Sequence, residues 1–182
     1  MASPEPPDFE ARIAAARDGD RSAWELLYRE HAPAVLGYLR AQRLDAAEDV
    51  LAEVWLQVVR DLQHFKGRSD PEFRGWILRM AHNRLVDDRR AFARRMAEVP
   101  VAQPPETAAE TDPDPPVDNP AQLEHLFRGL PATQRAVLYL RYVLDLPQGE
   151  IAEVLGSTLA AVKMQQRRGI DAIAARLEEA RR

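Results

Sequence analysis

A proline-rich, acidic stretch divides this chain and limits what it can fold into. Residues 98–121 contain half of the chain's 14 prolines and have no Lys or Arg. Almost no large apolar side chain occurs there, so the stretch cannot bury enough surface to form a core. We therefore predict a disordered or extended linker over 98–121, which joins one domain at 8–97 to another at 122–182. The acids of this linker are Glu98, Glu106, Glu110, Asp112, Asp114 and Asp118.

The first of these domains has the apolar spacing of amphipathic helices. In one expected helix, Val50, Val54, Val58 and Leu62 recur at every fourth residue. Another is expected to open at Pro71, because proline suits the first turn of a helix. No stretch alternates apolar and polar residues for long enough to form a strand. The sequence therefore predicts an all-α protein of two small helical domains.

Short patterns in the first domain predict where helices begin. Ser22 with Glu25, and Asp45 with Glu48, match the capping box, in which two side chains three residues apart bond to each other's backbone amides. Pro33 is expected to kink or interrupt the helix that follows Ser22.

Several aromatic side chains and one histidine of this domain could either pack in the core or contact a ligand. Trp76, Phe65 and Phe73 are expected in the core, although Trp76 has the alternative of stacking on a base. His82 lies in an arginine-rich helix and is expected to be solvated or close to DNA.

The second domain has the form of a helix-turn-helix. Pro131 and Pro147 are placed to open helices, Gly156 to stop the shorter one, and Ser157 or Thr158 to cap the last. Such a pair projects its second helix into the DNA major groove. The alternative is a helical hairpin with a solvated basic face. The candidates to contact DNA are Thr158, Lys163, Met164, Gln165, Arg167 and Arg168.

The composition argues against several kinds of site. The chain has no cysteine, which excludes disulfides, thiolate metal sites and cysteine nucleophiles. Its four histidines are scattered, and no glycine-rich phosphate loop is present. We expect no catalytic residue, no metal and no cofactor. Neither a membrane-spanning run nor a secretory signal is visible, so we expect a cytoplasmic protein without a membrane partner.

Three stretches match a known order of motifs. Residues 76–90, WILRMAHNRLVDDRR, place Trp76, Asn83, Asp87 and Arg90 at the spacing of a promoter-melting helix. Residues 46–67 and 130–156 match a polymerase-binding helix and a minus-thirty-five-binding domain. In this order the motifs resemble the extracytoplasmic-function (ECF) group of bacterial sigma-70-family sigma factors. The last helix departs from the group at Ala160–Ala161 and at 164–166, which leaves its base preference open.

The resemblance implies partners and roles. Core RNA polymerase and promoter DNA would be bound by separate surfaces, an anti-sigma factor is an expected inhibitor, and catalysis would belong to the polymerase. Asn83 is the leading candidate to contact a flipped base. The polymerase-binding residues would be Glu48, Asp49, Glu53 and Gln57. The minus-ten residues would be Lys66, Arg68, Ser69, Arg74, Asn83, Arg84, Asp87 and Arg90, and the six candidates of the last helix would bind the minus-thirty-five element.

Alternatives that need no polymerase or promoter contact remain for the acids at 48–57, for the linker and for the whole chain. The acids at 48–57 are also compatible with an ordinary solvated helix face. The linker is either an inert tether or an anionic segment that occupies the polymerase's RNA path. The whole chain has two further interpretations: a stand-alone helix-turn-helix regulator that binds DNA without polymerase, and a helical adaptor without a DNA role.

Overall fold

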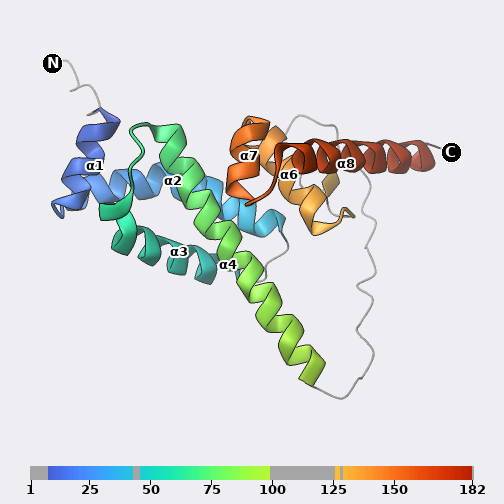
Figure 1. The fold of residues 1–182 in the computed structure, drawn as a ribbon, viewed down its shortest axis with the longest axis horizontal. Helices are drawn as coiled ribbons and strands as arrows, with labels where there is room; N and C mark the ends of the chain where they lie inside the picture. Colours follow the sequence, from blue (N-terminus) through green and yellow to red (C-terminus); the bar gives the residue numbers. More distant parts are fainter. Residues whose placement is uncertain (1–7, 43–45, 99–125, 128, 182) are drawn as a thin grey trace.

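The computed structural model describes residues 8–42, 46–98, 126–127 and 129–181, and the regular structure within those ranges is helical (Figure 1). This confirms the all-α prediction. We call residues 8–98 the N-terminal half and residues 126–181 the C-terminal half. The helices of the N-terminal half are α1 (Phe9–Arg17), α2 (Arg21–Ala41), α3 (Ala47–Asp61), the 3-10 turn η1 (Leu62–His64) and α4 (Asp70–Glu98). Those of the C-terminal half are α6 (Ala132–Tyr142), α7 (Gln148–Val154) and α8 (Leu159–Ala180). Apart from Glu98, the predicted linker lies outside the described residues.

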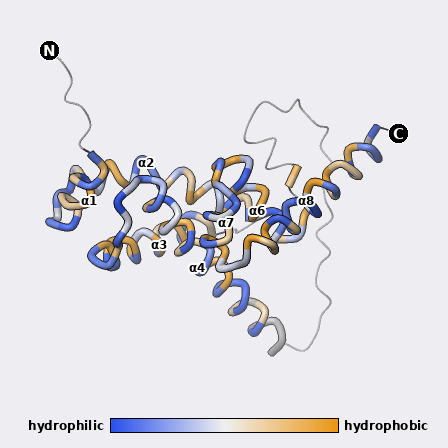
Figure 2. Tube along the Cα trace, turned by 45° about the horizontal axis from the view of Figure 1, so that its top comes forward, coloured by the Kyte–Doolittle hydropathy of each residue, from blue (hydrophilic) through white to orange (hydrophobic). Residues whose placement is uncertain are grey.

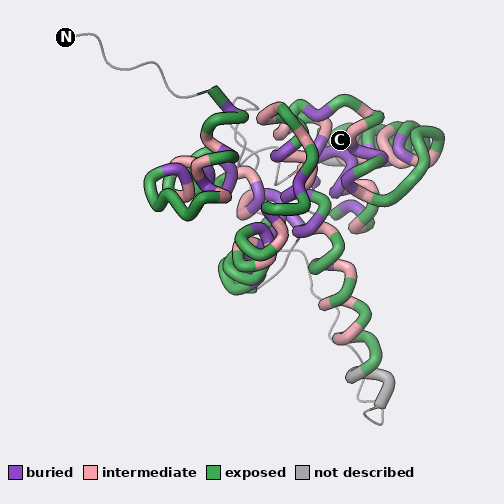
Figure 3. The backbone as a smooth tube through the Cα atoms, turned by 60° about the vertical axis from the view of Figure 1, so that its left-hand side comes forward, coloured by how far each residue is buried: buried purple, intermediate pink, exposed green. Residues whose placement is uncertain are grey.

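Helix α4 is the element on which both halves meet. It packs against α2 and α3 of its own half and against α7 of the other, and it runs through the centre of Figure 1. Phe73, Ile77, Leu78 and Leu85 form its buried face. Its last turns extend beyond the other helices and are exposed or half-buried where they are described (Figure 3). Because the buried and open faces of α4 are both long, it can support a core and a binding surface together.

The apolar residues that recur at every fourth position form the buried face of α3. Val50, Val54, Val58 and Leu62 are each at most 5% exposed, which confirms the periodicity argument. Figure 2 shows the same banding of apolar and polar residues along α4 and α8. A helix with such a stripe is stabilised mainly by what it packs on, rather than by its own propensity.

One local prediction at α2 is wrong. Its N-cap is Asp20, whose carboxylate accepts from the backbone amides of Ser22 (2.7 Å) and Ala23 (3.1 Å). Ser22 therefore lies inside the first turn, and Glu25 pairs with Arg21 instead of closing a capping box. The helix continues through Pro33, so the predicted interruption does not occur, and a kink at Pro33 stays a prediction. At α3, Ala46 holds the N-cap position, and Asp45 of the other predicted box lies outside the described residues.

The capping box of this half is at the start of α4. The Ser69 hydroxyl donates to the Glu72 carboxylate (2.9 Å), which also accepts from the backbone amides of Arg68 (2.8 Å) and Ser69 (3.0 Å). The Glu72 amide donates in return to Ser69 Oγ (3.5 Å). Hydrogen bonds from Arg68 and Ser69 lower the pKa of Glu72. This exchange satisfies amides that a helix start leaves without partners.

The helix-turn-helix forms as predicted. Pro131 and Pro147 precede α6 and α7, and Gly156 has a φ of +57°, a left-handed conformation that favours glycine. Thr158 Oγ1 accepts from the amide of Ala161 (3.1 Å) and caps α8.

Candidate nucleic-acid interface

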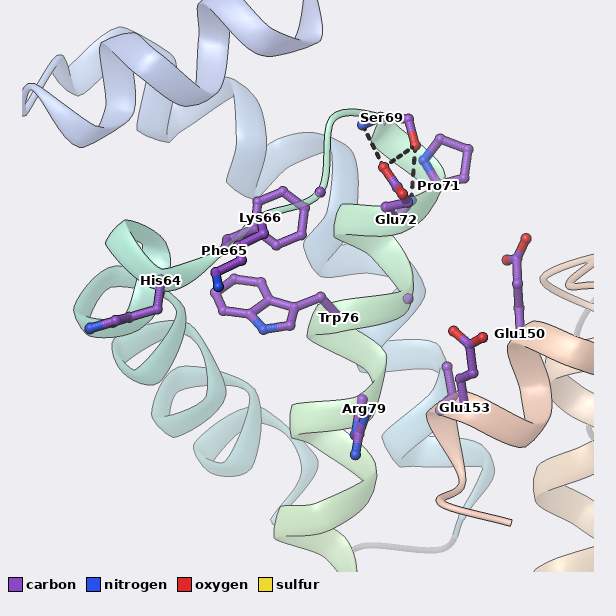
Figure 4. A pocket seen from close by; sticks show the side chains of 13 residues that line it. His64, Phe65, Lys66, Ser69, Pro71, Glu72, Trp76, Arg79, Glu150 and Glu153 are labelled. Carbon is purple, nitrogen blue, oxygen red and sulfur yellow. Dashed lines mark hydrogen bonds between the residues drawn. The ribbon is translucent and has the colours of Figure 1, made fainter. Parts of the chain in front are cut away.

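A hollow of about 630 Å³ lies between the loop before α4, α4 itself and α7 (Figure 4). Phe65, Lys66, Trp76 and Arg79 line it from the N-terminal half. The Trp76 ring packs on Phe65, with 5.0 Å between centroids. Phe65 is buried, as predicted, but Trp76 is half-buried and also faces the hollow. Trp76 therefore belongs to the edge of the core and keeps one side open to the hollow.

The loop that forms one wall of this hollow is held tightly. A Cβ atom on Gly67 would lie 2.4 Å from the Phe65 ring, so glycine is needed for this close approach. The Ser69 hydroxyl, a predicted DNA contact, is engaged in the capping box with Glu72. The side chains of Lys66 and Arg68 are exposed. The loop thus presents exposed basic side chains between a close backbone contact at Gly67 and the capping box at Ser69.

The predicted minus-ten residues of α4 fall on different sides of the helix. Asn83, Asp87 and Arg90 are exposed, and their spacing of four and three residues places them on one face, on the same side as Trp76. Arg84 turns toward α3 and pairs with Glu53, as well as with Asp88 at 3.8 Å.

Arg74 is half-buried and lies close enough to His31 to contribute to the lowering of the pKa of that imidazole. The structure therefore brings Asn83, Asp87 and Arg90 together and separates Arg74 and Arg84 from them.

His82 has a structural role that the sequence did not indicate. It is half-buried, and its Nδ1 lies 2.8 Å from the Tyr38 hydroxyl. Burial, followed by the nearby Arg89 guanidinium, lowers the pKa of His82. The expectation that this side chain is solvated is wrong, because α4 turns it toward α2 rather than outward.

Some of the predicted DNA-contacting side chains of α8 are exposed, and others contact other parts of the protein. Lys163, Met164, Arg167 and Arg168 are exposed, and Met164 is 42% exposed despite its apolar side chain. Gln165 is half-buried and faces a second hollow, which α4 shares. The Thr158 hydroxyl is used in the cap. Val162 is 1% exposed and anchors the helix from beneath.

Gln166 was not among the predicted residues, yet it positions the open face of α8. Its Oε1 accepts from Gln148 of α7 (2.7 Å), and its Nε2 donates to the Tyr142 hydroxyl of α6 (2.9 Å). Three helices are thereby joined at one side chain. The only sequence signal was a glutamine in register with the buried Val162, four residues earlier.

The predicted polymerase-binding residues lie along the open side of α3. Glu48 pairs with Arg40, and the side-chain hydrogen bond from Arg40 lowers the pKa of Glu48. Asp49 is exposed and makes no ion pair with another described residue. Gln57 donates to Asp61 at 3.4 Å. The sequence analysis missed Leu56, which is 63% exposed beside these polar groups.

One partly buried charge cluster lies away from these surfaces. Arg12 of α1 pairs with Glu30 and lies 4.0 Å from Asp70. His31 Nε2 is 3.3 Å from Asp70, and burial lowers the pKa of His31 more than its acidic neighbours raise it. The Glu30, His31 and Asp70 ligand atoms lie within 4.8 Å of one another, but the Arg12 guanidinium already supplies the positive charge there. The cluster ties α1 to α2 and α4.

Comparison with known proteins decides what these surfaces belong to. Residues 27–95 match the family described as Sigma-70 region 2, and residues 121–173 match Sigma-70, region 4. The ECF RNA polymerase sigma factor SigD of Mycobacterium tuberculosis is 31% identical over 171 residues, covering 89% of this chain and 80% of SigD. This chain belongs to the ECF sigma factors. It is thus a promoter-recognising sigma factor, and that regulatory role fits the expectation that it is not an enzyme.

Other relatives agree with this membership. The ECF sigma factor RpoE of Cereibacter sphaeroides is 28% identical and covers 90% of this sigma factor and 92% of its own length. Two solved structures share the fold at a TM-score of 0.66: CnrH in complex with the cytosolic domain of CnrY, and RpoE in complex with the anti-sigma factor NepR from Bartonella quintana. They are 21% and 15% identical, and cover 93% and 85% of the sigma factor and 97% and 96% of their own chains. Among the described residues, no helix combines the length and apolarity needed to cross a membrane.

Proposed function

We propose that this sigma factor binds core RNA polymerase through the open side of α3 and promoter DNA through α4 and α8. Its cellular location would be the cytoplasm, where the polymerase acts. The proposal at α3 is supported by Asp49, Glu53 and Gln57, which lie along one helix beside the exposed apolar Leu56. Acids around an apolar side chain suit a basic partner surface, with charge guiding association and the apolar contact slowing release.

Minus-ten recognition is proposed for the face of α4 that carries Trp76, Asn83 and Arg90, together with the loop at Lys66. A base that leaves the stack needs an aromatic surface and an edge-reading polar group. The half-buried Trp76 offers the surface, and the exposed Asn83 offers both a donor and an acceptor. Lys66 is exposed and can bind a phosphate, and Arg90 can do so by exchanging its solvent-exposed pair with Asp87 (3.8 Å) for the phosphate. Ser69 and Arg84 are then supporting residues, because both are engaged within the protein.

Minus-thirty-five recognition is proposed for the open face of α8. The observation that carries it is that Lys163, Met164, Arg167 and Arg168 are exposed while Val162, which comes directly before them in sequence, is buried. Arginine and lysine can bind phosphate or guanine, and an exposed methionine can contact a thymine methyl group. Gln165 joins this face only if it leaves the hollow that it shares with α4.

Two further roles follow from the family. The acidic segment 98–121 is proposed as a linker that occupies the positively charged RNA path of the polymerase until RNA displaces it. An anti-sigma partner is proposed because a sigma factor of the same fold, RpoE of Bartonella quintana, was solved with the anti-sigma factor NepR. Replacing the six linker acids by alanine is expected to weaken initiation and leave duplex binding unchanged. Equal initiation by that variant would exclude the role for the linker.

Reconstitution with bacterial core polymerase tests the whole proposal. We expect promoter-specific runoff transcription after selection of promoters by the reconstituted holoenzyme. Asn83→Ala is expected to reduce open-complex formation with little loss of polymerase affinity, and Glu178→Gln on the exposed end of α8 is a matched surface control. A chain that binds DNA alone and never co-purifies with core polymerase would be a stand-alone regulator. A chain that does neither would be an adaptor.

A further inference from the structure

Helix α8 is held against α6 by apolar contacts along one line. Val162 is 1% exposed, and Gly169, about two turns further on, is buried against Leu138 of α6. A Cβ atom on Gly169 would lie 2.8 Å from a methyl carbon of Leu138, so the two helices are in close contact there. Apolar contacts depend little on direction. A helix held along this line alone could therefore still roll about its own axis.

Two hydrogen bonds to one side of this line oppose such rolling. Gln166 comes four residues after Val162 and is turned about 40° from it around the helix. Its Oε1 accepts from Nε2 of Gln148 (2.7 Å), and its Nε2 donates to the Tyr142 hydroxyl (2.9 Å). Hydrogen bonds weaken steeply when their angle changes, and a carboxamide can accept and donate at once. Gln148, Gln166 and Tyr142 thus form a polar relay across three helices.

The two partners of this glutamine are themselves fixed relative to each other. Tyr142 is the last residue of α6, and Gln148 is the first of α7. Between them, the Leu146 amide donates to the Leu140 carbonyl (2.9 Å), and the Leu146 carbonyl accepts from Arg141 (3.1 Å). The Leu146 side chain is fully buried. The connection between α6 and α7 is therefore a firm support from which α8 takes its roll angle.

The same side of α8 carries candidate DNA contacts. Lys163, Gln166 and Arg167 line a shallow hollow of about 250 Å³ together with Gln148. Lys163 is exposed, and so is Arg167, which pairs with Asp171 at 3.8 Å. A side chain that extends about 6 Å from the helix axis moves by about 1 Å when the helix rolls by about 10°. That shift is enough to break a hydrogen bond to a base, whose heavy atoms must lie about 2.7 to 3.2 Å apart.

We propose that Gln166 is a positioning residue that sets the roll of α8 through Gln148 and Tyr142, and thereby sets the base preference in the minus-thirty-five element. Gln166 lies in the stretch 164–166, where this helix departs from the ECF group, and the departure places a polar support beside the reading face. This role rests on the proposed minus-thirty-five binding by α8. It requires no contact between the relay and a base.

The first measurement concerns the relay in the free full-length chain. Gln166→Met keeps the length and the helix propensity of the side chain but has no amide, so the signals that it loses identify the Gln166 side-chain amide by NMR. We expect Tyr142→Phe to shift those signals, because it removes the hydroxyl that accepts from Gln166. Tyr28→Phe, at a tyrosine of similar exposure (44% against 47%), should leave them in place. Unshifted signals in Tyr142→Phe would overturn the relay.

The second measurement is promoter selection by each holoenzyme. We expect Gln166→Met to lower the preference for the selected minus-thirty-five sequence about tenfold at one or two base positions, as for loss of one base contact. The slope of affinity against salt should stay as in the parent, because no charge is removed. Tyr142→Phe should change the preference at the same positions. The double variant should match Gln166→Met, because both changes remove one and the same hydrogen bond.

The other results of promoter selection overturn this role. An equal loss of affinity for all sequences would mean that the relay only stabilises the domain. A changed preference in Gln166→Met without any change in Tyr142→Phe would mean that Gln166 contacts a base itself. If the parent holoenzyme has a minus-thirty-five preference and all variants keep it, the positioning role fails and the proposed function stands. A parent holoenzyme without such a preference would overturn the proposed function and the positioning role together.

Discussion

The Tyr38 hydroxyl of α2 and Nδ1 of His82 on α4 lie 2.8 Å apart and join two helices of the N-terminal half. Burial raises the pKa of Tyr38, and burial with the nearby Arg89 lowers the pKa of His82. Both shifts favour a neutral pair at neutral pH. Tyr38 then donates its O–H and His82 accepts at Nδ1, with the ring proton on Nε2.

This pair predicts a loss of stability in mild acid. The pKa of His82 is lower in the folded chain than its ordinary 6.5, so the unfolded chain binds the proton more readily. The stabilisation is complete above pH 6.5 and is lost as the pH falls toward the folded-state value; His31, also lowered, contributes with the same sign. Thermal unfolding of the parent should therefore shift downward between about pH 7.5 and pH 5.5. His82→Gln should reduce that shift, and the exposed His64→Gln should leave it as in the parent. An undiminished shift in His82→Gln would contradict the assignment.

The capping box at α4 predicts that replacing Ser69 by alanine costs more free energy of unfolding than replacing Ser22, although both serines stand in similar sequence patterns. Ser69→Ala removes the exchange with Glu72 and is expected to lower the free energy of unfolding by about 1 kcal/mol, the usual cost of losing an N-cap. Ser22→Ala should cost well under half of that, because the Ser22 side chain caps nothing and Asp20 holds the N-cap. Urea unfolding of the three chains measures both. Equal costs would mean that the cap at Ser69 contributes no more than a surface serine.

At the Glu53–Arg84 pair, we expect loss of the ion pair to change stability little, whereas loss of the Glu53 charge should weaken polymerase binding. Both side chains are close to half exposed, so solvent and salt screen the pair and its loss should cost less than about 1 kcal/mol. If Glu53 contributes to the proposed polymerase surface, Glu53→Gln should weaken polymerase affinity by more than this. Arg84→Met is the matched variant, because it breaks the same pair and keeps the acid. Equal losses of affinity in both variants would assign the effect to the pair instead of to polymerase contact.

The exposed face of α8 predicts two kinds of DNA-binding defect. Lys163→Ala should weaken holoenzyme binding to all promoters alike and lower the slope of affinity against salt by about one, as for loss of one phosphate contact. Met164→Ala should leave the salt slope unchanged and alter the preferred minus-thirty-five sequence, because an apolar side chain contacts bases and not phosphates. Salt titration and promoter selection with each holoenzyme check the two outcomes. A salt-slope change in Met164→Ala would contradict its assignment to a base.

Much of the local structure was predictable because local chemistry encodes it. The spacing of Val50, Val54 and Val58 specified the buried side of α3, and Gly156 with Thr158 specified the turn and cap of the helix-turn-helix. One wrong prediction also concerned a short segment, the capping box at Ser22, but its cause lies outside that segment. Ser22 and Ser69 both stand three residues before a glutamate, and a choice between them depends on where the helix begins in the packed chain.

The amino-acid sequence by itself determined the helices, the family and the set of candidate binding residues on α4 and α8. Periodicity and motif spacing are properties of a single segment, so they can be read without the fold. Tertiary structure decided which of those residues are available. It turned His82 toward Tyr38, directed Arg84 to Glu53, and placed α7 against α4. These outcomes depend on how faces of separate helices fit around shared buried groups such as Gln42, and such fits join residues far apart in sequence that no local pattern relates.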